Sequence, residues 1–322
     1  MCMASLLDRD WEPALELTRS LGITSVEAMG GGHTPRRHYD PLVLADSAQA
    51  RQAFVGAAAN HGIEVVALGC YGNVLDPDAA GRRAAREDLA ATMRAAAELG
   101  IHTVTSNAGC PAGAPGDTVP NWIVHSLFPK RWDAAYRWQW DECVIPYWRE
   151  AGRLAEQYDV VLALEPMAGD VFYNLATFKR LREHAGERIL CHVDPSHLWW
   201  QGIEIADFIA ALDGAIGFAH VKDVSINQSA LRLEGWLPSC AYDDWDNRSW
   251  TMRAIGYGHP ELFWREYAIA LRRGGYDGVV AIEFQEPYMT VEDGLRKSVD
   301  VMRQALPAEP PPAGNWFEMY GG

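Results

Sequence analysis

Four apolar runs in the second half of the chain each end at a side chain that can bind a metal ion. Those side chains are Glu165, Asp194, His220 and Glu283. Three carboxylates and one imidazole suit Mn²⁺ best, with Mg²⁺, Co²⁺ or Zn²⁺ as alternatives, and they leave positions open for substrate oxygens. A divalent ion would also offset the repulsion among carboxylates gathered in a low-dielectric site. We therefore predict one divalent-metal site built from these four side chains.

Any one of these residues alone would be interpreted as an ordinary polar residue at the end of a strand. The pattern recurs on four successive strands, at the same end of each, which favours a shared site over four coincidences. Strand side chains alternate between two faces, so an inward-facing His220 predicts an inward-facing Lys222 as well.

The apolar runs belong to a repeated unit of helix, glycine, β-branched strand and polar loop. Expected strands span residues 3–7, 23–28, 63–69, 101–106, 160–165, 188–194, 216–220 and 279–283. Expected helices span residues 11–21, 46–60, 79–99, 142–158, 175–185, 205–212, 261–273 and 291–306. This alternation predicts an α/β fold, the (β/α)8 TIM barrel. A doubly wound open sheet is the alternative, but no Gly-x-Gly-x-x-Gly follows an early strand.

Two long connections interrupt the regular alternation. Residues 107–140 follow the fourth expected strand, residues 224–260 follow the seventh, and both segments contain several tryptophans. Long loops in compact domains are functional or disordered, and disordered segments are poor in tryptophan, so we expect residues 107–140 to form a structured lid. We expect residues 1–306 to form a single catalytic domain, followed by a Pro-rich tail, residues 307–322, that could dock on a neighbouring subunit of a homo-oligomer.

The composition of the chain limits which classes of partner and which cellular compartment we expect. The 322 residues are 48% hydrophobic and carry a formal net charge of -15, which argues against nucleic acid or an anionic membrane as partner. The six cysteines are scattered singly without a Cys-x-x-Cys pair, which is typical of reduced structural thiols. No secretory signal and no uninterrupted run of about 20 apolar residues is present. We expect a soluble cytoplasmic protein.

At the four metal-capable residues the chain resembles the xylose-isomerase-like TIM-barrel superfamily of sugar isomerases and epimerases, which includes ketose 3-epimerases. A Glu, Asp, His, Glu quartet binds one divalent metal in that superfamily, and the match falls on Glu165, Asp194, His220 and Glu283. The resemblance implies that Glu165 and Glu283 also exchange the proton α to a carbonyl. It implies further that His197, in the Asp-x-x-His pattern, contacts a substrate oxygen.

A narrower resemblance rests on the segments DPSHLWWQGIE, HVKD, RSW followed by GYGH, and LRRGGYDGVVAIE. They look like a subgroup that includes catalytic α-subunits of C-glycoside deglycosidases. The resemblance implies a lyase that eliminates the aromatic aglycone of a 3-oxo-C-glucoside, together with a small β-subunit. Tryptophan-rich insertions favour this outcome, because indole faces suit sugars and flat aglycones. The alternatives are a ketose isomerase or 3-epimerase, and a sugar-binding barrel without catalysis.

Further site residues are predicted from their position on the expected loops. His125, on the expected lid, is a candidate general base. Lys222 could polarise a substrate oxygen, or pair with Asp223 or another acid. Arg253 and His259 are candidates for substrate contact. No role is assigned to three residues near the second expected strand, which are Glu27, His33 and His38.

Overall fold

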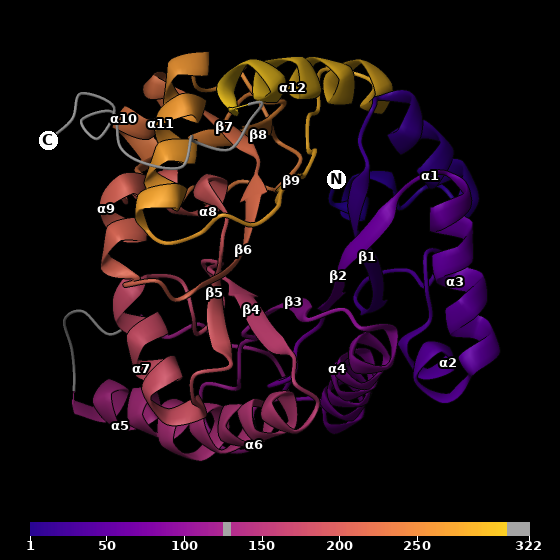
Figure 1. Ribbon diagram of the computed structural model, residues 1–322. Coiled ribbons are helices and arrows are strands. Elements are labelled where there is room, and N and C mark those ends of the chain that lie inside the picture. The colour runs from indigo at the N-terminus through magenta and orange to yellow at the C-terminus, as the bar shows by residue number, and fades with distance from the viewer. Residues whose placement is uncertain (125–129, 308–322) are drawn as a thin grey trace, which may run out of the picture.

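The computed structural model describes residues 1–124 and 130–307. Within these residues, parallel strands form one curved sheet in the order β1-β2-β3-β4-β5-β6-β9, and helices surround the sheet on the outside (Figure 1). The strands are β1 (Ser25–Gly32), β2 (Glu64–Tyr71), β3 (Thr103–Asn107), β4 (Val161–Glu165), β5 (Ile189–Val193), β6 (Ile216–Val221) and β9 (Val280–Ile282). The predicted TIM barrel is confirmed.

The chain start closes the barrel between β1 and β9. Cys2 N donates to Ile282 O at 2.9 Å, and Glu27 N donates to Met1 O at 2.9 Å. The strand expected at residues 3–7 is therefore wrong, because Met3–Leu6 form the short 3-10 helix η1. Two residues are enough to bridge the remaining gap in the ladder, and the chain turns out of the barrel directly after them.

The barrel helices begin and end at residues that the sequence marks clearly. The helices are α1 (Trp11–Ser20), α2 (Pro41–Asp46), α3 (Ala48–Asn60), α4 (Ala79–Leu99), α6 (Ile145–Gln157), α7 (Leu175–Ala185), α8 (Pro195–Trp199), α9 (Ile205–Ala211), α11 (Glu261–Arg273) and α12 (Val291–Ala305). Asp78 caps α4 by accepting from Gly81 N at 2.7 Å. Gly100 ends α4 with φ of 70°, a left-handed conformation that glycine adopts without a Cβ penalty.

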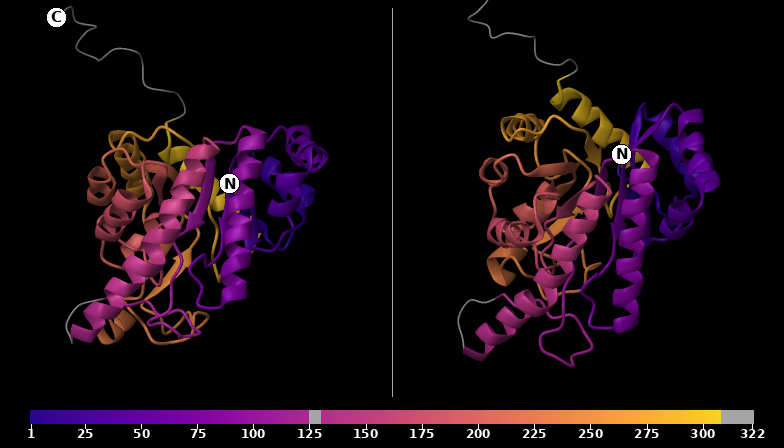
Figure 2. Two further views of the ribbon diagram at one scale, coloured as in Figure 1. Left: turned by 90° about the horizontal axis from the view of Figure 1, so that it is seen from below. Right: turned by 60° about the horizontal axis from the view of Figure 1, so that its bottom comes forward.

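The connection after β3 is more ordered than a loop. Helix α5 (Lys130–Trp138) continues through the π-helical segment η2 (Gln139–Val144) into α6, and α5 extends away from the barrel at one end (Figure 2). Gln139 is buried, and its Nε2 donates to Ala112 O at 2.8 Å and to Asn121 O at 2.7 Å. The helix expected from residue 142 thus starts within the segment that we had expected to be a long connection.

The insertion after β6 forms a two-stranded antiparallel sheet. Strand β7 (Asp223–Ile226) pairs with β8 (Trp250–Arg253), and α10 (Gln228–Glu234) lies between them in the sequence. The apolar side chains of this sheet pack with Trp200 and form a small cluster that is separate from the main core. The cluster comprises Trp200, Val224, Trp250 and Met252. The insertion therefore adds a second apolar surface next to the carboxyl ends of the barrel strands.

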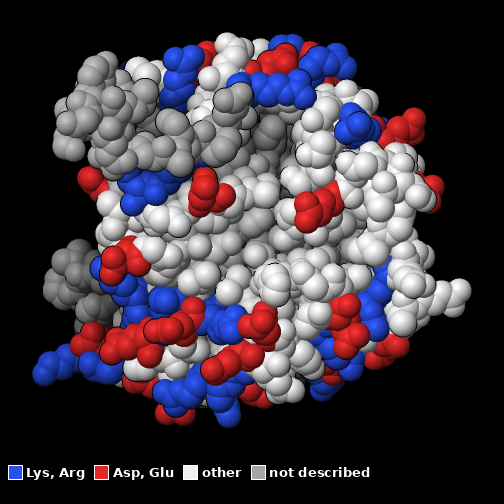
Figure 3. Space-filling view, viewed as in Figure 1, with Lys and Arg blue, Asp and Glu red and all other residues white. Residues whose placement is uncertain are grey.

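The main core lies between the sheet and the helices, where Trp140, Trp148 and Trp264 are fully buried. Acidic and basic side chains are interspersed over the peripheral elements on the face shown in Figure 3. Among the described residues, the helices are all too short or too polar to traverse a bilayer. The predicted division between a barrel and a tail at residue 307 stays a prediction, because residues 308–322 lie outside the described residues.

Candidate metal centre

The four predicted ligands meet at the carboxyl ends of their strands. Glu165 is the last residue of β4, Asp194 follows β5, His220 lies near the end of β6, and Glu283 follows β9. One donor atom from each residue lies within 4.8 Å of the corresponding atoms of the other three. The side chains are buried, with residue exposures of 3%, 0%, 1% and 8% in the same order. The structure therefore brings together all four residues that the sequence singled out.

The two carboxylate oxygens of Asp194 have different roles: one caps a helix and the other faces the site. Oδ1 accepts from Ser196 N at 2.8 Å and caps the short helix α8, in which Pro195 occupies the first turn. Aspartate and proline are favoured at these two positions, because the cap satisfies a free N–H and proline has none to satisfy. Oδ2 remains buried and faces the other ligands, so the residue's orientation is set by the start of a helix.

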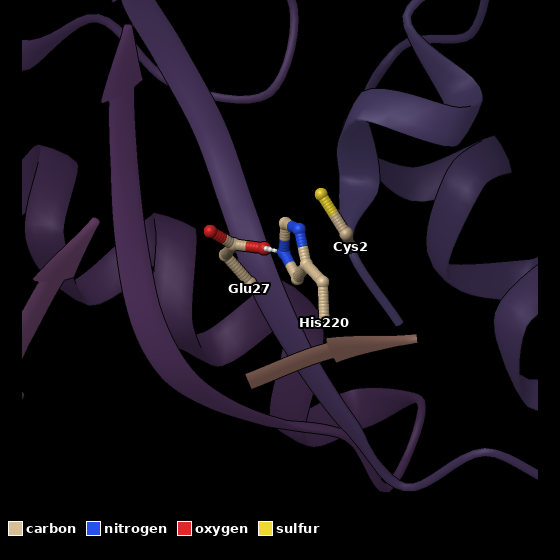
Figure 4. Close-up of side chains that lie close together, drawn as sticks. All are labelled: Cys2, Glu27 and His220. Atoms are coloured by element: carbon tan, nitrogen blue, oxygen red, sulfur yellow. Dashed lines mark hydrogen bonds and ion pairs between the residues drawn. The ribbon is translucent and has the colours of Figure 1, made fainter. Parts of the chain in front are cut away.

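His220 is held by a buried carboxylate on the far side of the barrel. Its Nε2 lies 2.6 Å from Glu27 Oε2, and Glu27 also accepts a hydrogen bond from the Thr105 hydroxyl. Figure 4 shows Glu27 and Cys2 beside the same imidazole. This contact leaves His220 Nδ1 facing the site, 3.1 Å from Glu283 Oε2. Histidine ligands of metals are commonly oriented by such a partner.

A second histidine supports the centre from the barrel interior. His192 is fully buried on β5, and its ring centroid lies 3.9 Å from that of His220 at an interplanar angle of 76°. Tyr71 Oη lies 3.1 Å from His192 Nδ1. Burial lowers the pKa of His192 to about 3, so this imidazole is neutral and packs against His220 without adding charge.

Lys222 supplies a positive charge inside the cluster. Its Nζ lies 2.6 Å from Glu283 Oε2, 2.9 Å from Asp194 Oδ2 and 3.9 Å from Glu165 Oε1. The sequence predicts that a divalent ion offsets the repulsion among the carboxylates; in the structure the buried Lys222 ammonium supplies part of that positive charge. Of the two roles predicted for Lys222, pairing with acids other than Asp223 is confirmed, since the ammonium holds oxygens that a metal would use.

The pKa values of the cluster follow from these close contacts. Burial works to raise the pKa of Glu283, but the Lys222 ammonium and His220 outweigh it and hold the pKa at about 2. Burial works to lower the pKa of His220, but the Glu27 carboxylate raises it well above its usual value. The pKa of Asp194 is raised because burial outweighs the attraction of Lys222. The centre thus holds both signs of charge.

The donor atoms fit a divalent ion. Glu165 Oε1, Asp194 Oδ2 and His220 Nδ1 are buried and make no hydrogen bond of ordinary geometry among the described residues, although Lys222 Nζ lies 2.9 Å from Asp194 Oδ2 and Glu283 Oε2 lies 3.1 Å from His220 Nδ1. Buried polar atoms without good hydrogen bonds cost about 1–3 kcal/mol each, so the cluster can be stabilised further by a bound cation. Three oxygens and one imidazole nitrogen are a donor set that Mn²⁺, Mg²⁺, Co²⁺ and Zn²⁺ accept. These residues are therefore candidate metal ligands.

A cavity of about 480 Å³ opens beside the centre. Its inner end is formed by polar side chains, which are Glu165, His197, His220, Lys222 and Glu283. Its outer wall is largely aromatic and apolar, and it includes Trp200, Tyr242, Arg248, Trp250 and Met252. The cavity therefore joins a charged, ligand-bearing end to an apolar wall that comes mostly from the insertion after β6.

The other predicted site residues are placed at different distances from this cavity. His197, on α8, has its Nε2 3.1 Å from Lys222 Nζ and 3.4 Å from Glu165 Oε1. Arg253 Nε forms an ion pair with Glu286 Oε2 at 2.8 Å. Arg253 is not one of the described residues that line the cavity. His125 lies outside the described residues. The substrate-binding roles of His197, Lys222 and Arg253 stay predictions.

His259 is part of a loop that Asp223 holds in place. Asp223 is fully buried, and its Oδ2 accepts from Gly256 N, Gly258 N and His259 N at 2.9, 2.9 and 3.0 Å. A Cβ at Gly258 would meet Val224 O at 2.1 Å, so glycine is required for this close approach. His259 Nδ1 lies 2.8 Å from Asp223 Oδ1. Its predicted contact with substrate stays a prediction, and like Arg253 it is absent from the described cavity wall.

Comparison with known sequences places this fold and site in a family. The family described as xylose isomerase-like TIM barrel matches residues 15–305. The chain belongs to this family. It is also 34% identical over 298 residues to an uncharacterised Bacillus subtilis (strain 168) protein, YfiH, in a match that covers 92% of this chain and 95% of that protein.

Solved structures share the fold at low sequence identity. The IolI protein, solved with a bound zinc atom, superposes with a TM-score of 0.64 and 18% identity over 95% of this chain and 98% of that chain. The Escherichia coli 3-keto-D-glucoside 4-epimerase YcjR superposes with a TM-score of 0.63 and 15% identity over 92% of this chain and 95% of that chain. The predicted family is confirmed, and membership supports an enzyme that acts on sugars.

Proposed function

We propose that this chain removes the proton α to the carbonyl of a keto sugar in a reaction that depends on one divalent metal ion. The observation that carries the proposal is the meeting of Glu165, Asp194, His220 and Glu283 within 4.8 Å, buried beside a cavity of about 480 Å³. An ion held by these four residues supplies Lewis-acid stabilisation of negative charge on the substrate oxygens. We expect Mn²⁺ to be the most effective ion.

Side chains of the protein itself would transfer the proton and bind the sugar. Glu283 and Glu165 line the cavity, and both have pKa values held well below the ordinary range, because Lys222 and neighbouring histidines outweigh the effect of burial. We propose that one of these two carboxylates accepts the α-proton because of its position in the cavity; its lowered pKa keeps it ionised but does not strengthen it as a base. His197 and Lys222 line the same cavity, and we propose that they donate hydrogen bonds to sugar hydroxyls.

We propose elimination from a 3-oxo-glycoside as the outcome of this proton transfer. The C2–H bond breaks, a double bond forms between C1 and C2, the bond from C1 to the aglycone breaks, and the aglycone takes a proton. Trp200, Trp250 and Tyr242 on the cavity wall support a flat aromatic aglycone. The reaction resembles that of the α-subunits of C-glycoside deglycosidases, and we propose cytoplasmic location and assembly with further subunits on the same ground.

A ketose isomerase or 3-epimerase is the second candidate. Two carboxylates, Glu165 and Glu283, lie at the same centre, which would allow one to remove a proton and the other to return it. The likeness in fold to the 3-keto-D-glucoside 4-epimerase is compatible with this outcome. Both candidates share the α-proton transfer and differ only in the step after it, which is loss of the aglycone in one and return of a proton in the other.

The two outcomes are separated by product analysis in D₂O. The Mn²⁺-loaded protein is incubated with aryl 3-oxo-glucosides and with free ketoses, alone and with any co-encoded small protein. Release of the aglycone selects the lyase, whereas a new ketose carrying deuterium at the α-carbon selects the isomerase or epimerase. If neither substrate class exchanges its α-proton in the presence of Mn²⁺, Mg²⁺, Co²⁺ or Zn²⁺, the proposed function is contradicted.

A further inference from the structure

Arg248 lies over two aromatic rings at the outer part of the cavity. Its Cζ is 4.0 Å from the ring centroid of Trp250 and 4.3 Å from that of Tyr242. Trp250 in turn stacks on Trp200 with centroids 4.6 Å apart and an interplanar angle of 11°. The N–H donors of a guanidinium lie in its own plane, and its faces are the part that packs on aromatic rings. The contacts with Trp250 and Tyr242 therefore leave the N–H edge of Arg248 as the part that can bind a ligand.

This guanidinium is a buried cation without an anion. Arg248 is 4% exposed, and its Nη1 donates to Tyr242 O at 2.6 Å. Among residues 1–124 and 130–307, no carboxylate forms an ion pair with it. A buried charge is costly unless it is paired and hydrogen-bonded. Four of the five N–H donors of Arg248 therefore have no hydrogen-bond partner among the described residues.

Lys222 also lines this cavity and differs from Arg248 in the partners of its charge. Its ammonium lies within 3 Å of Asp194 and of Glu283, so its charge is already balanced by the chain. Arg248 lies on the wall contributed by the insertion, away from that carboxylate cluster. The cavity thus has a ligand-bearing end suited to a carbonyl and hydroxyls, and an aromatic end with one cation that still lacks a counter-ion.

We infer that the substrate carries a carboxylate, remote from its keto group, that binds the free edge of Arg248. The planar fork of a guanidinium matches a carboxylate through two parallel N–H···O bonds, and a single negative charge matches the single unbalanced cation. A phosphate dianion would leave one charge without a partner on this wall. The inference rests on the proposed function, and it narrows the substrate class to keto-sugar acids or glycosides of acidic aromatic compounds.

The test compares probes that differ only in the charged group. Dissociation constants of the Mn²⁺-loaded protein are measured by calorimetry for D-fructuronate, D-fructose and D-fructose 6-phosphate, and for benzoate and benzamide. We expect at least one carboxylate to bind about 10- to 100-fold more tightly than its neutral counterpart, as expected for hydrogen bonds to a charged group. Tighter binding of the phosphate than of every carboxylate would overturn the assignment, as would the lack of any carboxylate preference.

Variants of Arg248 test whether this residue causes the preference for carboxylate over neutral probes. Arg248→Gln should bring the ratio of carboxylate to neutral affinity close to one, and Arg248→Lys should retain part of it, because an ammonium keeps the charge but loses the planar fork. The ratio is taken within each variant, so a general loss of folding cancels. Arg180→Gln is the matched control, because Arg180 lies over Trp140 at 4.4 Å outside the cavity. An unchanged ratio in Arg248→Gln would overturn the inference.

Failure of this inference and failure of the proposed function give different results. If D-fructose exchanges its α-proton as fast as D-fructuronate, and Arg248→Gln leaves both rates equal, the function stands and the carboxylate site is wrong. If a carboxylate probe binds in an Arg248-dependent manner but no keto sugar exchanges its α-proton with any of the four metal ions, the site stands and the function is wrong.

Discussion

The imidazole of His220 has different partners at its two nitrogens. Glu27 Oε2 lies 2.6 Å from Nε2, while Nδ1 is buried beside Glu283 and Glu165. Glu27 is itself completely buried, and its pKa of about 2 shows that His220 outweighs the effect of burial, which alone would raise that pKa. The carboxylate therefore orients the imidazole through Nε2–H, so that a metal ion could take the place of the proton on Nδ1.

Glu27→Gln is expected to weaken metal binding by about 10- to 100-fold, the usual effect of losing a partner that orients a ligand. An amide holds the imidazole less strongly and can present an N–H to it. Calorimetric titration with Mn²⁺ measures the dissociation constant. Asp88→Asn is the control, because Asp88 is a buried carboxylate that pairs with Arg36 instead. Equal metal affinity in wild type and Glu27→Gln would refute this role of Glu27.

Glu283→Gln is expected to lower turnover by about 10²- to 10⁴-fold while the protein stays folded. The substitution removes a charged metal ligand, one candidate base and the partner of Lys222 at 2.6 Å. Initial rates and circular dichroism are measured together. Glu292→Gln is the same change on the exposed side of α12 and should leave turnover unaltered. Retained activity in Glu283→Gln removes Glu283 from the reaction.

The residue types at the strand ends were sufficient to predict the quartet, because carboxyl ends of parallel strands converge in a barrel. Glu27 could not be assigned in this way, since 193 residues separate it from His220. Arg248 was missed for a similar reason. It belongs to the RSW segment, but its burial depends on how the insertion folds over the cavity.

At the scale of elements, the β7–β8 sheet decides the shape of the cavity. Trp250 and Met252 on β8 line the cavity and pack in the small cluster outside the main core. Asp223 at the start of β7 anchors the loop that follows β8 through three backbone N–H groups. The insertion therefore forms part of the cavity wall, and its two strands are separate from the barrel sheet.

Trp250→Ala is expected to lower the catalytic efficiency for aryl 3-oxo-glucosides by about tenfold, because it removes the ring that stacks on Trp200 and supports Arg248. Its effect on unfolding by urea should be smaller than that of Trp148→Ala. Trp148 is fully buried in the main core, where such a truncation costs about 3–5 kcal/mol. If Trp250→Ala has the same catalytic efficiency as wild type, the aromatic wall does not contact substrate.

Helix bounds were predicted well where the chain carries explicit caps. The expected ranges 79–99 and 175–185 agree with α4 and α7, which begin after Asp78 and Asn174. Strands β7 and β8 were not predicted, because each has only four residues. The two strands also lie about two dozen positions apart in the sequence. Helix α5 was missed because its polar, tryptophan-containing sequence was interpreted as part of a lid.

At the scale of the whole molecule, the candidate metal site brings together residues from both ends of the chain. Met1 and Cys2 close the barrel between β1 and β9, while Glu27 and Glu283 reach the centre from opposite halves of the sequence. The barrel itself was predictable from eight apolar runs, but the first run was placed too far along the chain. Only the ladder shows that two residues suffice to close the sheet.

Metal binding should therefore stabilise the whole barrel. At a free Mn²⁺ concentration 100 times the dissociation constant, the free energy of unfolding should rise by about 2.7 kcal/mol, because the ion binds only the folded chain. Urea unfolding is followed with Mn²⁺ and then with a chelator, which should reverse the gain. Asp194→Asn should lose most of it. An equal gain in Asp194→Asn would place the stabilising ion elsewhere.

The most direct measurement is an anomalous-difference map from crystals soaked in Mn²⁺. We predict one strong peak per chain within about 2.0–2.4 Å of the facing atoms of Glu165, Asp194, His220 and Glu283. We also expect Lys222 Nζ to have moved away from the oxygens that it contacts at 2.6 and 2.9 Å in the present structure. A map with no peak there, and with Lys222 still on Asp194 and Glu283, would contradict the account.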